Sequence, residues 1–409
     1  MKKEIIKYII VFFTLIGIYI IFSTAVSLLP TKIIKRNIEV STKEMVKDGD
    51  YPCGIITKKQ YQMDNFTDAL ILSQNFSINS NRPFHSALNP RFAHVPGTNL
   101  SNALKLQVEL SDIHLIDYPR YWHGNTFLLR PFLLFTDYSV IRWVLYVISS
   151  LFLLVLGIKL YQTLGMIKTI AFFLGLLFVN IFITQFSIQF FISVNLSLIA
   201  CILMCNHFNN RKKILLFSFI FGSLTAYLDL LTTPLLTCGL PLIVYLSAEN
   251  EDSFKTRLSS LFRFAFLWGI GYSFTWVSKW TLGTIFTEKN VFRDAFDTVL
   301  FRTSSEDFSR FDSIISNFEL LPVFFISLIL ILLFPLVVLF FNRKAIKTNL
   351  LLLIVATFPF LWFLFAAQHS WWHWWFTYRI LAISIIAVFF IFINFISWNR
   401  INTMINRKK

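Results

Sequence analysis

Long apolar stretches, separated by shorter polar segments, dominate the chain. A helix needs about 20 predominantly apolar residues to cross the hydrocarbon core of a bilayer, and about ten of these stretches approach that length. The pattern therefore predicts an all-α protein, a polytopic bundle of about ten transmembrane helices. The expected spans are 8–29, 140–158, 169–186, 190–206, 214–231, 233–247, 262–285, 320–341, 350–367 and 377–397.

Two polar segments are too long to be simple turns between helices. The larger runs from 30 to 139, directly after the first expected span, and the smaller runs from 287 to 319. The expected organisation is a tail and first span (1–29), a large extracytoplasmic loop (30–139), spans two to seven (140–286), a second extracytoplasmic loop (287–319), and the last three spans with a basic tail (320–409).

The second loop carries the spacing of two amphipathic helices. Phe292, Phe296 and Val299 follow the helical period, and a second set begins at Phe308. The run 304–307, Ser-Ser-Glu-Asp, is typical of a capping box that opens the second helix. Such helices lie in the outer membrane interface, where they cover the bundle or line the entry path of a lipid.

Composition narrows the class of protein further. The chain is 56% hydrophobic and 14% charged, with 48 Phe among its 409 residues, which excludes a soluble enzyme and a disordered adaptor. Its four cysteines are too scattered for a disulfide framework. Ala25-Val26-Ser27 resembles a signal-peptidase site, and cleavage there would leave nine spans, but the apolar run before it is long enough to favour an uncleaved anchor.

A net charge of +15 would suit a protein that binds nucleic acid, but the positions of the charges along the chain indicate a membrane orientation signal instead. Lys and Arg gather at alternate connections, as the positive-inside rule requires of cytoplasmic segments, so we expect both termini in the cytoplasm and no nucleic-acid partner. These residues are Lys2, Lys3 and Lys7, Lys159 and Lys168, Arg211 to Lys213, Lys255, Arg257 and Arg263, Arg343, Lys344 and Lys347, and Arg400 with Arg407 to Lys409.

Asp64 and Asp68 are the first candidate catalytic residues. They stand four positions apart in the large loop and share one face if the segment is helical. Such a pair could deprotonate an acceptor hydroxyl or hold a divalent cation. The alternative is structural, with Asp64 as an N-cap and Asp68 as a first-turn carboxylate facing the helix dipole.

Arg120 and His123 belong to a segment rich in aromatic residues, 117–125, close to the second span. Arg suits phosphate, and Tyr and Trp rings can stack on sugars, so this segment is a candidate substrate-binding site. The alternative is an interfacial aromatic belt in which Arg120 contacts ordinary lipid phosphates.

A second aromatic segment, 368–379, contains four Trp together with His369, His373 and Arg379. Arg379 enters the last span near its outer end, where a charge is costly unless it faces a partner or a polar cavity. We expect Arg379→Ala to lower turnover more than protein abundance. A zinc site on the two histidines is a weaker alternative, because no third ligand is evident.

Asp229 and Lys279 complete the candidate substrate-binding residues. Each lies at the outer end of an expected span, where ionisable groups usually face the bundle interior or water. Together with the residues above, they would place several cations and carboxylates at one membrane depth. The alternative is a structural ion pair between Asp229 and Lys279.

A long first outer loop with acidic residues, many spans, short inner loops and cationic outer helix ends resemble the GT-C class of membrane glycosyltransferases. The resemblance covers most of the chain and is one of architecture. It implies a sugar transferred from a polyprenyl-phosphate donor to a glycan or lipid acceptor at the outer face, with Asp64 or Asp68 as base or metal ligand. Arg379, Arg120 or Lys279 would hold the phosphate. Members often carry adjacent acidic residues near the start of this loop, whereas here the pair is spaced by three residues.

Two other classes remain open. A polysaccharide polymerase or a lipid-linked glycan flippase would also need outer cations and aromatic residues, and a secondary transporter ranks third because no internal repeat is found. The Lys-, Asn-, Ile- and Phe-rich composition favours a low-GC bacterium, and hence the plasma membrane with its lipids as the location. No cofactor is certain, and a divalent cation is a further candidate.

Overall fold

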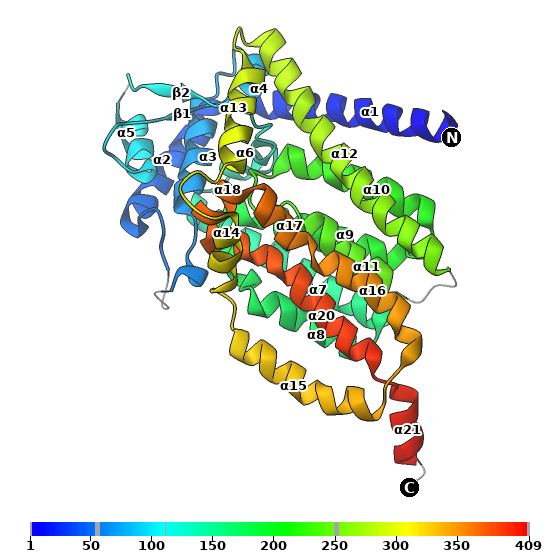
Figure 1. Cartoon of the computed structure of the whole chain (residues 1–409). Coiled ribbons are helices and arrows are strands. Elements are labelled where there is room, and N and C mark those ends of the chain that lie inside the picture. Colours follow the sequence, from blue (N-terminus) through cyan, green and yellow to red (C-terminus); the bar gives the residue numbers. More distant parts are fainter. Residues whose placement is uncertain (1, 54–57, 111, 249–252, 407–409) are drawn as a thin grey trace.

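The computed structural model describes residues 2–53, 58–110, 112–248 and 253–406 (Figure 1). Almost all of the regular structure is helical, and one short two-stranded antiparallel sheet completes it. The all-α class predicted from the sequence is therefore confirmed.

Five helical segments are long and apolar enough to cross a membrane. They overlap the expected spans 8–29, 140–158, 190–206, 350–367 and 377–397, and they indicate a membrane protein. They are α1 (Lys2–Ser27), α7 (Tyr138–Leu164), α9 (Ile188–His207), the segment Arg343–Phe365 with η3 (Arg343–Ala345), α16 (Ile346–Ala356) and α17 (Phe358–Phe365), and the segment Trp374–Phe395 with α19 (Trp374–Thr377), η4 (Tyr378–Leu381) and α20 (Ala382–Phe395).

A sixth span is formed if two helices separated by a sharp bend count as one. α14 (Arg310–Phe318) and α15 (Val323–Leu339) meet at an angle of 76°. α15 is the apolar member of the pair and corresponds to the expected span 320–341.

The other four expected spans are helical but differ from the prediction in length or polarity. The stretch 169–186 is divided because Asn180 has a positive φ of 50°, which ends one helix before a 3-10 turn begins. The first turn of α10 consists of three cations, and α12 carries several charged residues along its length. The elements are α8 (Met166–Phe178), η2 (Ile181–Phe186), α10 (Arg211–Leu228), α11 (Leu236–Ser247) and α12 (Phe254–Phe286). The count of about ten spans stays a prediction.

Helices α10 and α12 approach each other closely along much of their length. Small residues allow this approach, because a Cβ atom at Gly222 or Gly271 would clash with a backbone carbonyl oxygen of the opposite helix. α1 joins the pair through the stacked rings of Tyr19 and Tyr227, 4.0 Å apart. α1, α10 and α12 thereby pack together as a three-helix unit.

The main hydrophobic core lies among the helices that share the centre of the bundle in Figure 1. α11 has all twelve residues buried, as expected of a helix surrounded by others on every side. The α9 and α20 helices pack against it and contribute many of the other buried apolar side chains.

Residues 31–133 form a compact unit, here called the loop domain, and share a second, smaller hydrophobic core with α7 and α9. Its two strands pair in antiparallel register, with Arg91 opposite Asp117. The elements are α2 (Thr31–Asp48), η1 (Lys59–Tyr61), α3 (Asn65–Ser77), α4 (Pro83–Leu88), β1 (Arg91–Ala93), α5 (Leu100–Glu109), β2 (Leu115–Asp117) and α6 (Asn125–Leu133).

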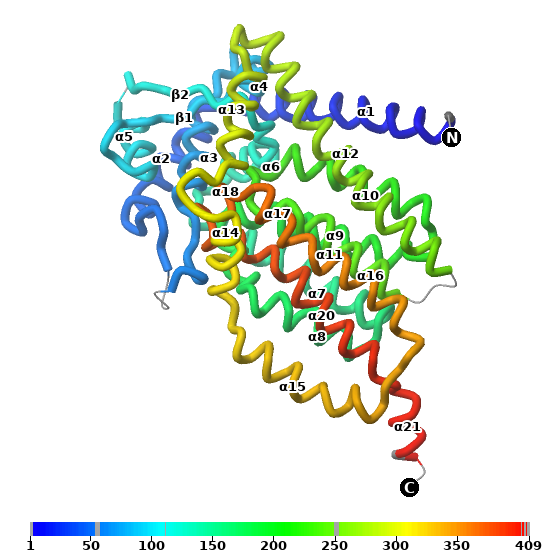
Figure 2. The backbone as a smooth tube through the Cα atoms, viewed as in Figure 1, coloured from blue at the N-terminus to red at the C-terminus, as the bar shows by residue number. Residues whose placement is uncertain are grey.

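The loop domain lies at one end of the helical bundle, and both chain termini lie away from it (Figure 2). Arg130 attaches the domain to the end of α1. Its side chain is fully buried and donates to the carbonyl oxygens of Val26 (2.8 Å), Leu29 (3.3 Å) and Asn75 (2.9 Å). These bonds join the end of α1 to α3 and α6 of the loop domain.

The second loop forms the two predicted helices, α13 (Val291–Thr303) and α14. The predicted position of the capping box at 304–307 is wrong. The box is made by Ser309 and Asp312, because α14 begins only at Arg310. Both helices expose large apolar side chains, including Phe296 and Phe311. They lie near the loop domain and α18 (Ala367–Trp372), and α21 (Trp398–Asn406) ends the described chain (Figure 1).

Candidate functional site

An apolar pocket of about 450 Å³, here called the aromatic pocket, lies between α12, α13 and α17. Its size falls in the range typical of sites for organic ligands. The residues that give it its character are seven aromatic side chains on two helices and in the loop after β2. They are Tyr121, Trp268, Tyr272, Trp276, Trp280, Trp362 and Phe365.

Four of these aromatic residues form a ladder along α12. Trp268, Tyr272, Trp276 and Trp280 recur every four residues and therefore share one face of the helix. Successive ring centroids are 5.0, 6.2 and 6.1 Å apart. At 1.5 Å per residue, the ladder extends about 18 Å along the helix. Sequence reasoning missed the ladder, although the fourfold spacing is visible in the sequence.

Arg120, one of the predicted substrate-binding residues, lies at the wall of the aromatic pocket. Its Nη1 donates to both carboxylate oxygens of Asp294 on α13, at 3.0 and 3.1 Å. The guanidinium stacks on the ring of Tyr118, 4.4 Å from its centroid, and the backbone carbonyl accepts from Trp280 Nε1 at 3.1 Å. These contacts hold a cation at the edge of an apolar cavity.

Arg302, in the last turn of α13, is a second cation in the pocket wall. Its Nη1 donates to His369 Nδ1 at 2.6 Å, and His369 Nε2 in turn donates to the carbonyl of Leu231 at 2.8 Å. Burial, the neighbouring His373 and Arg302 hold the pKa of His369 well below its ordinary value, which agrees with this neutral form. Sequence reasoning missed Arg302, which shares a helix face with Val299.

The predicted residue Asp229 follows the last turn of α10 and lies next to the pocket wall. Its Oδ2 accepts from the backbone N–H of Thr232 at 2.9 Å, while its buried Oδ1 has no partner among the described residues. Leu231, two residues on, lines the pocket with a positive φ of 67°, a strained conformation for a large side chain. The turn thus places a carboxylate with one free oxygen behind the pocket wall.

Lys279 is fully buried but does not reach the aromatic pocket. Its Nζ donates to the carbonyl oxygen of Leu88 at 2.7 Å and that of Ala87 at 3.5 Å, at the end of α4. The alternative of an ion pair with Asp229 is wrong, because Lys279 points to the loop domain and Asp229 is bonded within its own turn.

The other two predicted histidines lie outside the pocket wall. His123 is buried, contacts the carbonyl of Tyr118 through Nε2 at 3.0 Å, and has its pKa lowered to about 3 by burial and by Lys279. His373 packs its ring on Phe376, 5.1 Å away, and burial with Arg302 lowers its pKa to about 4.

Arg379 is buried and connects the last span with the loop domain. Its Nη2 donates to the carbonyl of Gln60 at 3.2 Å, and its Nη1 to that of Trp375 at 3.4 Å. The guanidinium lies 4.9 Å from the ring centroid of Phe190. The costly buried charge predicted at this position is therefore stabilised by carbonyl dipoles and an aromatic face.

Asp64 is the N-cap of α3, so the structural alternative for this residue is confirmed. Its Oδ1 accepts from the backbone N–H of Thr67 at 3.0 Å, and only 2% of the residue is exposed. Burial, with nearby Asp68 and Asp50, raises its pKa to about 7. A buried carboxyl that titrates near neutral pH is suited to proton transfer as well as to capping.

Asp68 has no exposed surface and stabilises the start of α9. It accepts hydrogen bonds from the backbone N–H groups of Ile188 (2.9 Å) and Gln189 (3.0 Å), from Ser187 Oγ (3.2 Å) and from the hydroxyl of Tyr138. The structural alternative predicted that Asp68 faces the dipole of its own helix. The carboxylate instead faces the dipole at the start of α9. Two carboxylates so close in sequence thus have separate structural partners.

The structure brings only part of the predicted set together. Arg120 lines the aromatic pocket with Arg302, and His369 contacts the lining residues Arg302 and Leu231. Asp229 lies two residues before Leu231, and the ring centroids of His369 and His373 are 4.9 Å apart. The remaining predicted residues lie towards the loop domain: Asp64, Asp68, His123, Lys279 and Arg379.

A metal site is not apparent in the described part of the chain, where no three His, Cys, Asp or Glu residues converge. The two nitrogens of His369 are both occupied by hydrogen bonds, so this ring has no free lone pair for the zinc pair considered above.

Comparison with known protein families, curated proteins and solved structures finds no match to this chain.

Proposed function

We propose that this protein is a membrane glycosyltransferase that moves a sugar from a polyprenyl-phosphate donor to a cell-surface glycan or lipid acceptor. The observation that carries the proposal is the aromatic pocket, in which an apolar ladder about 18 Å long leads to two guanidinium groups, Arg120 and Arg302. A lipid phosphate has the same two parts, an extended apolar chain and an anionic head.

The ladder on α12 suits an isoprenoid chain because its surface is apolar, continuous and linear. Aromatic side chains bury large areas at a low cost in side-chain entropy. The neighbouring helices α13 and α14 expose further apolar residues, so a lipid could enter from the membrane without crossing a polar barrier.

The two arginines suit the phosphate of the donor. As the sugar departs, the bond between its anomeric carbon and the phosphate oxygen breaks, and the phosphate takes the electron pair. Guanidinium groups fixed beforehand by Asp294 and His369 stabilise this developing charge without reorganisation. Arg is well matched to phosphate because its planar fork can donate two parallel hydrogen bonds.

A carboxylate is needed to accept the proton of the acceptor hydroxyl while the new glycosidic bond forms. Asp229 is the predicted carboxylate nearest the pocket, and its Oδ1 is free of hydrogen bonds from described residues. We assign the base to Asp229, with Asp64 as the second candidate because of its raised pKa.

The membrane arrangement predicted from the sequence agrees with this assignment and belongs to the proposal. With both termini in the cytoplasm, the loop domain, α13 and α18 would face the outside of the bacterial plasma membrane. In Figure 1 these elements share the end of the bundle away from the termini, which supports a single outer face.

The test is the surface-glycan composition of the producing cells with wild-type protein, a deletion, Asp229→Asn, Asp64→Asn or the exposed control Asp112→Asn, at matched protein abundance. We expect the deletion and Asp229→Asn to lose one sugar or branch and Asp112→Asn to keep it. If Asp64→Asn is the only point variant that loses the sugar or branch, the base is Asp64 and not Asp229.

Two results would contradict the proposed function. Shorter chains of unchanged composition would indicate a polymerase, and an unchanged glycan in the deletion strain would exclude a role in the surface glycan and favour a secondary transporter. Either result is independent of which carboxylate is the base.

A further inference from the structure

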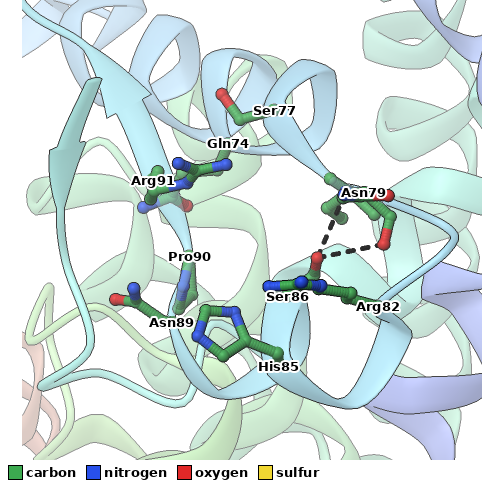
Figure 3. Close-up of a pocket in the computed structure, with 10 residues that line it drawn as sticks. Gln74, Ser77, Asn79, Arg82, His85, Ser86, Asn89, Pro90 and Arg91 are labelled. Atoms are coloured by element: carbon green, nitrogen blue, oxygen red, sulfur yellow. Dashed lines mark hydrogen bonds between the residues drawn. The ribbon is translucent and has the colours of Figure 1, made fainter. Parts of the chain in front are cut away.

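A second, smaller pocket, here called the polar pocket, lies within the loop domain. It has a volume of about 160 Å³ and shares no lining residue with the aromatic pocket. This volume is well below the ~300–1,000 Å³ of drug-sized sites, so it suits a single sugar residue better than a chain. The side chains that matter come from the end of α3, from α4 and from the start of β1 (Figure 3): Gln74, Arg82, His85, Asn89 and Arg91.

Two buried amides in this pocket have unused hydrogen-bonding atoms. Only 2% of Gln74 is exposed, yet neither its Oε1 nor its Nε2 has a partner among the described residues. Asn89 is 6% exposed and donates to Asp117 Oδ1 at 2.8 Å, but its own Oδ1 is also without a partner there. Buried amides are almost always hydrogen-bonded, so a pocket lined by unsatisfied ones points to a ligand with hydroxyl groups.

The rim of the polar pocket is cationic. Arg82, His85 and Arg91 line it with exposed side chains, and none of the described lining residues is acidic. Neither arginine forms an ion pair with a residue in the described ranges. Arg91 lies opposite Asp117 in the strand pair and interacts with its charge, but it forms no ion pair with it. Two guanidinium groups at the mouth of a small pocket favour a carboxylate or a phosphate on the ligand.

The walls of the pocket are held in place from several sides. Asn79 and Ser86 join the end of α3 to α4 through hydrogen bonds of 3.1 and 3.2 Å (Figure 3). Lys279 of α12 fixes the last turn of α4 through the carbonyl of Leu88. Asp117, the partner of Asn89, is itself paired with Lys289 at 3.0 Å. A site preorganised in this way loses little freedom on binding.

We infer that the polar pocket binds an anionic sugar residue, with its carboxylate or phosphate between Arg82 and Arg91 and its hydroxyls on Gln74 and Asn89. Lys279 joins this pocket to the helix that carries the aromatic ladder, and the bound residue is a unit of the acceptor glycan. The role as acceptor rests on the proposed transferase activity, whereas binding of the anionic sugar does not.

The test is saturation-transfer NMR on the purified full-length protein with glucuronic acid, glucose 6-phosphate, glucose and inorganic phosphate as probes. We expect one or both anionic sugars to bind at least tenfold more tightly than glucose and inorganic phosphate, and their ranking distinguishes a carboxylate from a phosphate ligand. The double variant Arg82→Gln/Arg91→Gln should weaken that binding at least tenfold. The control Lys105→Gln, an exposed cation of the same domain, should not.

Equal binding of glucose and the anionic sugars, or an unchanged affinity in the double variant, would overturn the inference. Inorganic phosphate binding as tightly as the sugars would reduce the pocket to an anion site and overturn it as well. Because both arginines are exposed, the double variant should fold, and a thermal unfolding curve that matches wild type verifies this. If the protein binds the anionic sugar but does not bind polyprenyl phosphate at the aromatic pocket, only the proposed function is contradicted.

Discussion

At the scale of single residues, the three buried carboxylates differ in how many hydrogen bonds they accept, and hence in how well each could act as a base. Asp68 has four hydrogen-bond donors around it, whereas Asp229 keeps one oxygen free and Asp64 uses its Oδ1 to cap a helix. A carboxylate surrounded by donors is a poor base, because each hydrogen bond stabilises its charged form. Which carboxylate is free depends on contacts between distant segments, so no local sequence pattern could reveal it.

Asp64 should make stability depend on pH. Its pKa rises from about 4 in the unfolded chain to about 7 in the folded protein, so the folded state holds a proton that the unfolded state releases between these values. The stabilisation is complete below about pH 4 and is lost as the pH rises towards 7, with a slope of at most about 1.4 kcal/mol per pH unit.

Asp64→Asn keeps the helix cap and removes the titration, so its melting temperature relative to wild type should rise between pH 4 and 7. The measurement is thermal unfolding of both proteins in detergent across this range. A difference that stays constant with pH would show that Asp64 has an ordinary pKa in the folded protein.

At the scale of the elements, hydrophobic patterning predicted the helices but not how they end. The first and last expected spans appear as helices because their apolar runs are long and uninterrupted. The span 169–186 is divided at Asn180, and α14 begins later than predicted, since both boundaries depend on local backbone conformation that apolar periodicity does not encode. The aromatic ladder, in contrast, could have been predicted, because its residues recur every four positions in the sequence.

The close contact of α10 with α12 gives a prediction at this scale. Gly222→Ala should lower the free energy of unfolding by on the order of 3 kcal/mol, because the added Cβ would overlap the carbonyl oxygen of Trp268. Gly269→Ala is the matched control on α12, as no atom lies within 4 Å of its Cβ. The measurement is the thermal midpoint in detergent, and equal midpoints for the two variants would contradict this packing.

At the scale of the whole molecule, the alternation of basic segments predicts which end of the bundle faces the cytoplasm. Cys53 lies in the loop domain with a partly exposed side chain, whereas Cys201, Cys205 and Cys238 are buried. A membrane-impermeant maleimide should therefore label Cys53 in intact cells. In a Cys53→Ser background, Asn209→Cys in the connection before α10 should react only after lysis. Labelling of Asn209→Cys in intact cells would reverse the predicted orientation.

The site as a whole could be predicted only in part. Sequence reasoning predicted cations and aromatic residues at one end of the helices, and among them Arg120 lines the aromatic pocket while His369 contacts its lining residue Leu231. It could not separate the residues at the aromatic pocket from those that attach the loop domain, such as Lys279, because both groups stand at predicted helix ends in the sequence. Arg302 was missed because the side chain that fixes it, His369, lies 67 residues away in sequence.

The most direct test of the central claim is the affinity of the purified full-length protein for undecaprenyl phosphate, measured by native mass spectrometry. The wild type should bind this lipid more tightly than undecaprenol, which lacks the phosphate. Arg120→Gln and Arg302→Gln should each weaken binding about tenfold, the loss expected for one charge-assisted hydrogen bond. Arg293→Gln, an exposed arginine on the same helix as Arg302, should bind as wild type does. Equal affinity for phosphate and alcohol, or no effect of either pocket arginine, would contradict the lipid-phosphate site.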